Sequence, residues 1–186
     1  MILASGSPRR AELLTAAGFT FEAQPQQVDE RVRSGEDPAE YVLRIALDKA
    51  ARVECRESGV VVLAADTTVV IDGLVLGKPA DDRAAADMLK RLSGRTHDVL
   101  TGVVVRGNGR QLTDIERTRV RFLPLTDEEI AWYVASGEPR DKAGAYAIQG
   151  LAARFVDRID GSCSNVVGLP IATVYRLLRA VDAAQV

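Results

Sequence analysis

The sequence predicts an α/β fold in which helices pack against a mixed, twisted sheet. Two observations lead to this class: β-branched apolar runs alternate along the chain with segments of helical periodicity, and at least one hairpin is clear. The chain shows no internal repeat, low-complexity tract or obvious linker. Its 186 residues suit one domain, with room for two lobes, and are enough to bury a core.

The amino-terminal third predicts two short strands and two helices. Residues 2–4 are apolar and predict a buried strand, and a helix begins at Pro8 because Ser7 suits the N-cap and proline the first helical position. Gly18 can end that helix. The stretch FTFEAQ predicts a second strand, PQQVDERVRSGEDP a loop, and Asp37-Pro38 the start of a long helix to about Ser58.

The middle of the chain predicts strands joined by tight turns. VVVLAADTTVVIDG has strand character on both sides of Asp66, and Asp72-Gly73 predicts a tight turn from which LVLGKP returns as the paired strand. A helix over about 81–92 is capped by Gly94. Residues 97–125 then predict two long strands joined at Gly-Asn-Gly, the second of which alternates charged and apolar residues.

The last third predicts two more helices and one strand. Thr126 and Glu129 form a capping box for the helix DEEIAWYVAS. After it come the glycine-rich segment DKAGAYAIQG, a strand from Phe155 to Ile159, the loop DGSCSN, and a final helix from about Pro170.

Composition indicates a soluble globular protein and restricts its partners. The hydrophobic fraction is 47%, the charged fraction 27% and the net charge −2, so no basic stripe dominates and a coat on nucleic acid is not expected. Arg117, Arg119 and Arg121 alternate along one strand, which is typical of a solvated face, and no aromatic stacking platform accompanies them. Any anionic ligand must be held by locally placed cations.

Several catalytic schemes and locations are disfavoured. Cys55 and Cys163 match neither a disulfide framework nor a metal site, so we expect reduced thiols in a cytoplasmic protein. His97 is the only histidine, which disfavours a Ser–His or Cys–His pair. No signal peptide is evident and the apolar runs are too short to cross a bilayer, so no membrane partner is expected.

Asp66 is the main candidate for a catalytic residue. It lies between VVVLAA and TTVVI, in a run that otherwise predicts a buried strand, where an uncompensated carboxylate is costly. One interpretation is a metal-binding or catalytic acid. The other is a structural aspartate bonded to backbone N–H groups at a strand end or bulge.

Two lysines are candidate partners for this carboxylate. Lys49 lies on the same helical face as Val42 and Ile45, so it either reaches water at the edge of the core or points towards a negative charge. Lys78 ends the return strand of the hairpin that begins just after Asp66. Closing the hairpin can bring Lys78 near Asp66, and the alternative is an exposed lysine before a turn proline.

Arg9 and Arg10 follow the predicted helix start, where the backbone is already partly positive. Cations there are unfavourable by roughly 0.3–1 kcal/mol each. A bound polyphosphate reverses this, because free backbone N–H groups favour an anion and the arginine fork suits phosphate oxygens. The alternative is a pair of exposed arginines that bind acids such as Glu12.

Three polar residues outside these segments have two interpretations each. Asp29 and Glu30 stand beside Arg31 in a polar loop, where they are either solvated or ligands of a metal. Gln149 lies between Ile148 and a glycine, and it is either a turn residue or an amide that contacts a nucleotide base.

Five segments together resemble the Maf family of nucleoside triphosphate pyrophosphatases, also described as septum-formation inhibitors. They are LASGSPRRAELL, VDE, AADTTVVIDGLVLGKP, LSGRTHDVLTGV and DKAGAYAIQG, and the resemblance extends from residue 2 to VVGLPI. It implies a single domain over residues 1–186, with a mixed twisted sheet flanked by helices and two lobes around a central cleft. GAYAIQG resembles the branch that hydrolyses dTTP and UTP.

The resemblance also implies roles for individual residues. Asp66 corresponds to the catalytic base, and Thr67, Arg9 and Gln149 correspond to positions linked with substrate selectivity. The implied catalytic set is Asp66, Lys49, Lys78 and Glu30; the implied substrate-binding set is Ser5, Ser7, Arg9, Arg10, Thr67 and Gln149; the implied metal ligands are Asp66 and Glu30.

The resulting hypothesis is hydrolysis of dTTP or UTP, and of modified pyrimidine nucleotides, to the monophosphate and diphosphate. A divalent cation, Mg²⁺ or Mn²⁺, is expected to bridge carboxylates and substrate phosphates. House-cleaning of the nucleotide pool and arrest of cell division are the implied cellular roles, and a homodimer is expected. The alternative is a non-catalytic nucleotide-binding regulator of septum formation.

Overall fold

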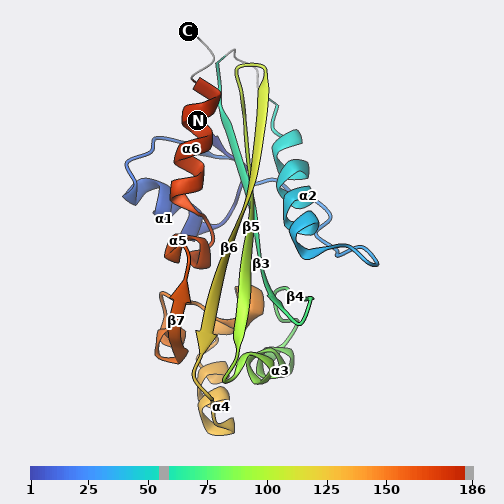
Figure 1. Cartoon of the computed structure of the whole chain (residues 1–186), viewed down its shortest axis with the longest axis vertical. Helices are drawn as coiled ribbons and strands as arrows, with labels where there is room; N and C mark the ends of the chain where they lie inside the picture. The colour runs from blue at the N-terminus through green and yellow to red at the C-terminus, as the bar shows by residue number, and fades with distance from the viewer. Residues whose placement is uncertain (55–58, 183–186) are drawn as a thin grey trace. The chain divides into compact units, whose positions relative to one another are not determined.

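The computed structural model describes residues 1–54 and 59–182, and it confirms the predicted mixed α/β class (Figure 1). The sheet has the strand order β2-β1-β3-β5-β6-β7, with β4 paired to β3 outside that path. The chain forms two compact units. The first comprises Met1–Thr67, Thr101–Glu116 and Gly168–Val186; the second comprises Thr68–Leu100 and Arg117–Val167.

The predicted strands and helices occur in the predicted order, and the last third of the chain has additional short helices. They are β1 (Ile2–Leu3), α1 (Pro8–Ala16), β2 (Glu22–Ala23), α2 (Pro38–Ala51), β3 (Val62–Ile71), β4 (Leu74–Leu76), α3 (Asp82–Leu92), β5 (Thr96–Gly107), β6 (Arg110–Phe122), α4 (Asp127–Ala135), the 3-10 helices η1 (Glu138–Asp141), η2 (Ala143–Ala145) and η3 (Leu151–Phe155), β7 (Val156–Asp160), α5 (Cys163–Val167) and α6 (Ile171–Asp182). Within the described ranges, no helix has both the length and the apolar character needed to cross a membrane.

In the first unit, helices cover both faces of the sheet. Strand β1 lies between β2 and β3 and runs parallel to both. Along β3, Val62 and Ala64 pack with the alanines of α2, whereas Leu63 and Ala65 pack with α1 and α6. Figure 1 shows α2 on one side of these strands and α1 and α6 on the other. Because both faces are buried, this part of β3 is continuously apolar rather than alternating.

In the second unit, β4 and β7 each add an antiparallel pairing to the sheet. Strands β3 and β4 form the predicted hairpin, and Asp72 and Gly73 take the positive φ values, 53° and 74°, that its tight turn requires. Strand β7 pairs with β6. The core of this unit includes Leu89, Tyr133 and Phe155, which come from α3, α4 and η3.

Most of the predicted helix starts and turns are confirmed. Asp37 Oδ1 accepts a hydrogen bond from the N–H of Ala39 at 2.8 Å at the start of α2. Thr126 and Glu129 form the capping box of α4. Ser7 occupies the N-cap position of α1, but its side chain makes no capping hydrogen bond.

Three predicted boundaries are wrong. The strand expected over residues 19–24 covers only Glu22–Ala23. Helix α2 ends at Ala51 rather than near residue 58, because Val53 turns into the core and its carbonyl accepts a hydrogen bond from Arg106 at 2.6 Å. The expected loop DGSCSN contains the start of α5, because the hydroxyl of Ser162 accepts the N–H of Asn165 at 3.3 Å. Cys55 lies outside the described residues, and Cys163 is a free, exposed cysteine.

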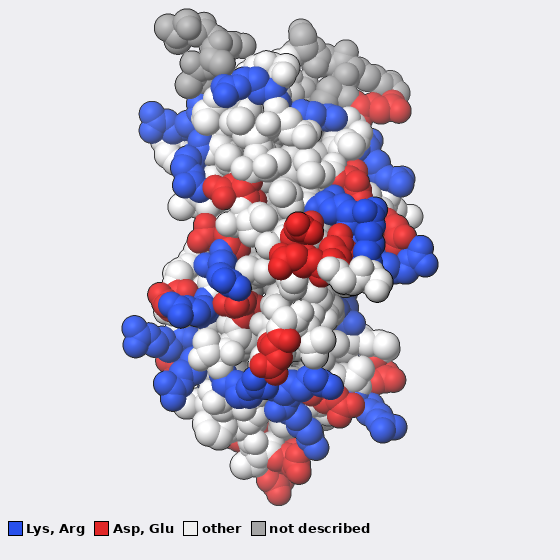
Figure 2. Space-filling view, turned by 45° about the vertical axis from the view of Figure 1, so that its right-hand side comes forward, with Lys and Arg blue, Asp and Glu red and all other residues white. Residues whose placement is uncertain are grey.

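The arginines of β6 form a solvated face, as predicted. Arg117, Arg119 and Arg121 pair with Asp98, Asp160 and Asp157 at 3.0, 2.5 and 3.3 Å. Each of these arginine side chains is more than 60% exposed, so the ion pairs contribute little to stability. Figure 2 shows basic and acidic side chains interspersed on the face that it presents.

His97 is a core residue of the second unit. It is 2% exposed, its Nε2 lies 2.9 Å from the hydroxyl of Tyr146, and its ring meets those of Phe122 and Tyr146 edge-on. Burial lowers its pKa from 6.5 to about 4, so the imidazole is neutral at physiological pH. The single histidine therefore serves packing.

Gly102 allows α2 to approach the sheet, and we predict that Gly102→Ala destabilises the protein. An added Cβ would lie 2.6 Å from the carbonyl oxygen of Val42 and 2.8 Å from the backbone nitrogen of Leu43. Because these are backbone atoms, the helix must shift, at a cost of about 1–3 kcal/mol in the free energy of unfolding measured with urea. Gly77→Ala is the control, since its Cβ meets nothing within 4 Å. Equal stabilities of the two variants would contradict the close approach.

The buried His97 predicts a specific sensitivity to acid. Between pH 6.5 and about 4 the unfolded chain binds a proton at His97 that the folded protein does not, so the free energy of unfolding falls as the pH falls through this range. The full effect is on the order of 3 kcal/mol. Because the chain has no other histidine, His97→Gln should lose stability less steeply than the wild type in urea titrations at pH 7, 6 and 5. Parallel slopes would count against a depressed pKa.

Candidate active site

The candidate site of the first unit is built around one buried ammonium group. Lys49 Nζ lies 2.7 Å from Asp66 Oδ1 and 2.6 Å from Glu30 Oε1. Lys49 and Asp66 are 7% and 8% exposed, whereas the side chain of Glu30 is 48% exposed. Of the two interpretations of Lys49, the structure supports the one in which the side chain points towards negative charge. The ammonium joins one buried and one accessible carboxylate.

The local sequence explains why these groups meet. Successive residues of a strand face opposite sides, so Asp66 shares its face with Val62 and Ala64, the face that α2 covers. On α2, Lys49 follows Ile45 by one helical turn, and both residues are buried. The carboxylate of Asp66 and the ammonium of Lys49 are therefore directed into the same layer between helix and sheet.

Burial and the neighbouring positive charges have opposite effects on the pKa of Asp66. Desolvation raises the pKa of its carboxyl group, and the positive charges of Lys49 and Arg10 act against that rise. Desolvation likewise lowers the pKa of Arg10, against the charges of Asp66 and Glu30. The result is a carboxylate that accepts a proton more readily than an exposed aspartate does.

Arg10 is part of the wall of this site. It is 8% exposed, and its Nε donates to the carbonyl of Gly168 at 2.9 Å, while its terminal nitrogens donate to the hydroxyls of Ser5 at 3.0 Å and Thr67 at 3.1 Å. The interpretation of Arg10 as an exposed arginine is thus wrong. Two of its partners, Thr67 and Gly168, lie 57 and 158 residues away in the sequence, and burial of the guanidinium group with its three acceptors fixes its orientation.

The hydroxyls beside Arg10 connect the amino-terminal segment to the rest of the site. Ser5 Oγ also accepts the backbone N–H of Ser7 at 3.2 Å. Thr67 Oγ1 lies 2.8 Å from the hydroxyl of Thr101 and donates to the carbonyl of Gly168 at 3.1 Å. Arg9, the neighbour of Arg10, is partly exposed. Thr101 and Gly168 were not predicted from the sequence, since neither has a local signal that separates it from an ordinary strand or loop residue.

Helix α2 holds the loop that carries Glu30. The hydroxyl of Tyr41 donates to the carbonyl of Glu30 at 3.0 Å, and Arg44 donates to the carbonyl of Arg31 at 3.1 Å. Arg44 also forms a 2.5 Å ion pair with Glu36. Burial and the nearby carboxylates of Asp66 and Glu30 raise the pKa of Tyr41 to about 12, so it remains a hydrogen-bond donor. Neither Tyr41 nor Arg44 was predicted from the sequence to belong to the site.

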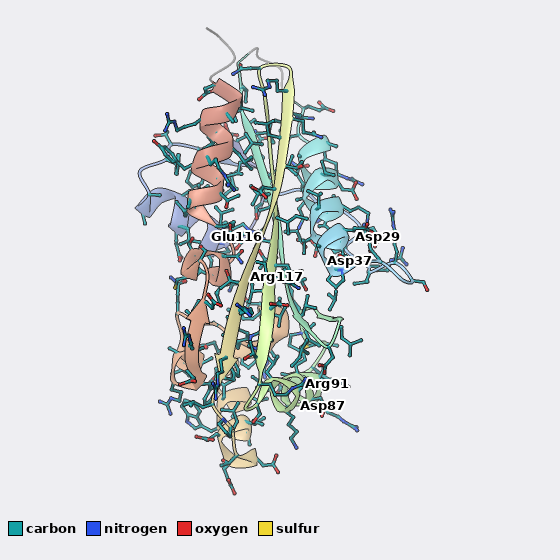
Figure 3. The ribbon with its side chains drawn as sticks, in the orientation of Figure 1. Asp29, Asp37, Asp87, Arg91, Glu116 and Arg117 are labelled. Carbon is teal, nitrogen blue, oxygen red and sulfur yellow. The ribbon has the colours of Figure 1, made fainter. Side chains whose placement is uncertain are left out.

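Asp29 and Glu30 have different surroundings, although they are adjacent. Asp29, labelled in Figure 3 on the loop beside α2, forms a 2.7 Å ion pair with Arg31, which lowers the pKa of its carboxyl group. Glu30 instead contacts Lys49 in the buried cluster. Of the two acids that the sequence suggested as ligands, the cluster includes only Glu30.

The two remaining predicted site residues belong to the second unit. Lys78 follows β4 and is exposed, and Gln149 is exposed between η2 and η3. Neither side chain forms a hydrogen bond or ion pair with another residue in the described part of the chain. That Lys78 lies near Asp66 stays a prediction.

Asp66 and Glu30 form a donor set that suits a divalent cation. No group of three or more His, Cys, Asp or Glu side chains able to hold a metal occurs among residues 1–54 and 59–182, so these residues contain no cage built from protein side chains alone. Mg²⁺ is commonly held by one or two carboxylates together with substrate phosphates and water. Two carboxylates on one ammonium group, one of them accessible, fit that mode of binding.

Comparisons with known proteins identify the family of this chain. Residues 1–181 match the family model described as Maf-like protein. A relative from Anaeromyxobacter dehalogenans (strain 2CP-C) is 54% identical, covering 96% of this chain and 92% of its own; one from Koribacter versatilis (strain Ellin345) is 51% identical, covering 96% and 93%. One from Geotalea uraniireducens (strain Rf4) is 50% identical, covering 100% and 96%. All three are named dTTP/UTP pyrophosphatase. The match spans both compact units, and the chain belongs to the Maf-like protein family.

Proposed function

We propose that this chain is a nucleoside triphosphate pyrophosphatase that hydrolyses dTTP and UTP to the monophosphate and pyrophosphate. The observation that carries the proposal is Asp66, a carboxylate buried on β3 and bound to Lys49, with the guanidinium of Arg10 close by. The names of the relatives support the same reaction and the same substrates.

Asp66 is the proton acceptor of the proposed reaction. A water molecule attacks the α-phosphorus, its proton passes to the carboxylate of Asp66, and the bond from the α-phosphorus to the oxygen bridging to the β-phosphate breaks. Pyrophosphate leaves with the electron pair of that bond. Because burial raises the pKa of Asp66, its carboxylate is a better general base than an exposed one.

The basic residues contribute position and charge. Lys49 fixes the orientation of Asp66 through the 2.7 Å contact and neutralises its charge. Arg10 already donates hydrogen bonds to Ser5, Thr67 and Gly168. It therefore contributes a fixed positive charge, rather than a guanidinium group that is free to bind phosphate oxygens in a bidentate way. Contacts to the triphosphate then come from Arg9, from Lys78 and from the polar groups at the start of α1.

Asp66 and Glu30 are the residues that would hold a divalent cation. When bound, Mg²⁺ or Mn²⁺ supplies Lewis-acid neutralisation of the phosphate charge. Thr67 and Gln149 are proposed to select the nucleotide, since an amide offers a donor and an acceptor to the edge of a pyrimidine. We further propose a cytoplasmic homodimer that removes unwanted nucleotides and acts in arrest of cell division.

Asp66→Asn should abolish activity while the fold is retained. The amide has nearly the shape of the carboxylate but cannot accept the proton, so we expect pyrophosphate release from dTTP to fall by about 10²–10⁴-fold. Circular dichroism checks the fold. The control is Asp98→Asn, which removes a partly buried carboxylate of the sheet that pairs with Arg117. An Asp66→Asn enzyme with wild-type turnover would refute the role of Asp66.

Glu30→Gln should lower the affinity of the enzyme for the divalent cation. Asp29→Asn is the matched control. The two acids are adjacent, but only Glu30 belongs to the cluster around Lys49. We expect Glu30→Gln to raise the Mg²⁺ or Mn²⁺ concentration for half-maximal activity at least about tenfold, and Asp29→Asn to leave it unchanged. Similar values for both variants would remove Glu30 from the metal site.

Turnover by the wild type separates catalysis from the alternative, a non-catalytic regulator. The assay compares dTTP, UTP, CTP and 7-methyl-GTP with each metal and measures pyrophosphate. Binding of dTTP without release of pyrophosphate would support the regulator and overturn the enzymatic proposal.

A further inference from the structure

We propose that Glu138 is a positioning residue that fixes the turn carrying Gln149, and thereby sets the affinity for the nucleotide base. The inference rests on the proposed function, in which Gln149 contacts the base. Every contact that supports it lies within the second unit.

The first observation is the turn itself. The N–H of Gly150 donates to the carbonyl of Ala147 at 3.1 Å, so residues 147–150 form a tight turn with Ile148 and Gln149 at its centre. Ile148 packs against the core of the second unit, whereas Gln149 is exposed. Within the described residues, the amide of Gln149 makes no side-chain hydrogen bond. The turn therefore presents one amide, unoccupied by the protein, to solvent.

The second observation is the carboxylate behind this turn. Glu138 Oε2 accepts the N–H of Leu151 at 3.0 Å, and its Oε1 lies 3.4 Å from the N–H of Ala152. These N–H groups begin η3, where they have no partner within the helix. Glu138, from η1, thus anchors the chain immediately after Gln149.

The third observation is the role of Tyr133, which is fully buried on α4. Its hydroxyl donates to Glu138 Oε1 at 2.8 Å and accepts the N–H of Ala147 at 3.2 Å. Ala147, the first residue of the turn, and Leu151, the residue after it, are therefore hydrogen-bonded to the same pair of side chains, Tyr133 and Glu138. Glu138 and Tyr133 hold both ends of the segment that carries Gln149.

Gly150 shows how closely the carboxylate packs on the turn. A Cβ at this position would lie 2.2 Å from Glu138 Oε2 and 2.5 Å from Oε1. The φ of Gly150 is −114°, so the left-handed region does not require this glycine. A side chain at this position would instead displace the carboxylate of Glu138 from the place that it occupies on the turn.

These contacts explain how an exposed side chain on a loop can recognise a ligand tightly. A flexible loop loses conformational freedom on binding, and that cost lowers the affinity. A turn that is held at both ends has already lost this conformational freedom when the protein folds. More of the free energy of the contact between Gln149 and the base is then available for binding. Glu138 is expected to act on base binding alone, without contact with the reacting phosphates.

The test compares the effects of substitutions on KM and on kcat for the hydrolysis of dTTP. Glu138→Ala should raise KM about tenfold and leave kcat within about threefold, because a contact made equally in the ground and transition states affects KM only. Glu138→Gln, whose amide cannot accept both N–H groups of η3, should give an intermediate value. The inhibition constant of pyrophosphate, which lacks a base, should not change. Asp82→Asn is the control, since it removes an exposed ion pair to Arg140 on the same short helix η1.

Two double variants test whether Glu138 acts through the turn that carries Gln149. Gln149→Ala should raise KM as Glu138→Ala does, and their combination should raise it no further, since one acts through the other. Gly150→Ala should raise KM in the wild type but have little added effect in Glu138→Ala, where the clash is gone. An unchanged KM in Glu138→Ala, or additive effects with Gln149→Ala, would overturn this inference alone. A wild type that releases no pyrophosphate from dTTP would overturn the proposed function, and this inference with it.

Discussion

The contact between the ammonium of Lys49 and two carboxylates is the constraint on which the first unit depends. Taking charges out of water is costly, and the cost is recovered only when the partners are close and well oriented. Asp66 and Lys49 meet this condition because α2 packs tightly on β3 through alanines and over Gly102. The same packing that buries the apolar face of α2 therefore determines the distance within the ion cluster.

The parts of the fold that depend on local chemistry could be predicted from the sequence. The Asp72-Gly73 turn and the capping box of Thr126 follow from preferences of neighbouring residues. The end of α2 could not be predicted, because it depends on a hydrogen bond from Arg106, 53 residues away, to the carbonyl of Val53. The start of α5 escaped prediction because a Ser-rich loop gave no apolar periodicity.

The sequence likewise indicated some residues of the candidate site but not their surroundings. An acid in an apolar run identified Asp66, and helical spacing placed Lys49 on the buried face, but it could not decide whether the lysine meets a charge or water. The surroundings of Arg10 were beyond sequence reasoning, since its acceptor Gly168 is 158 residues away. Tyr41 and Arg44 likewise act on a loop without regular structure, where periodicity carries no information.

Lys49 also has a consequence for the relation between folding and metal supply. In many metalloproteins the carboxylates of the site repel one another until an ion arrives, and the stability of the protein then varies with the concentration of that ion. Here the chain carries its own counter-ion for Asp66 and Glu30, so their mutual repulsion is relieved without any solute. Folding of the cluster around Lys49 thus needs no bound divalent cation to offset the repulsion between its two carboxylates.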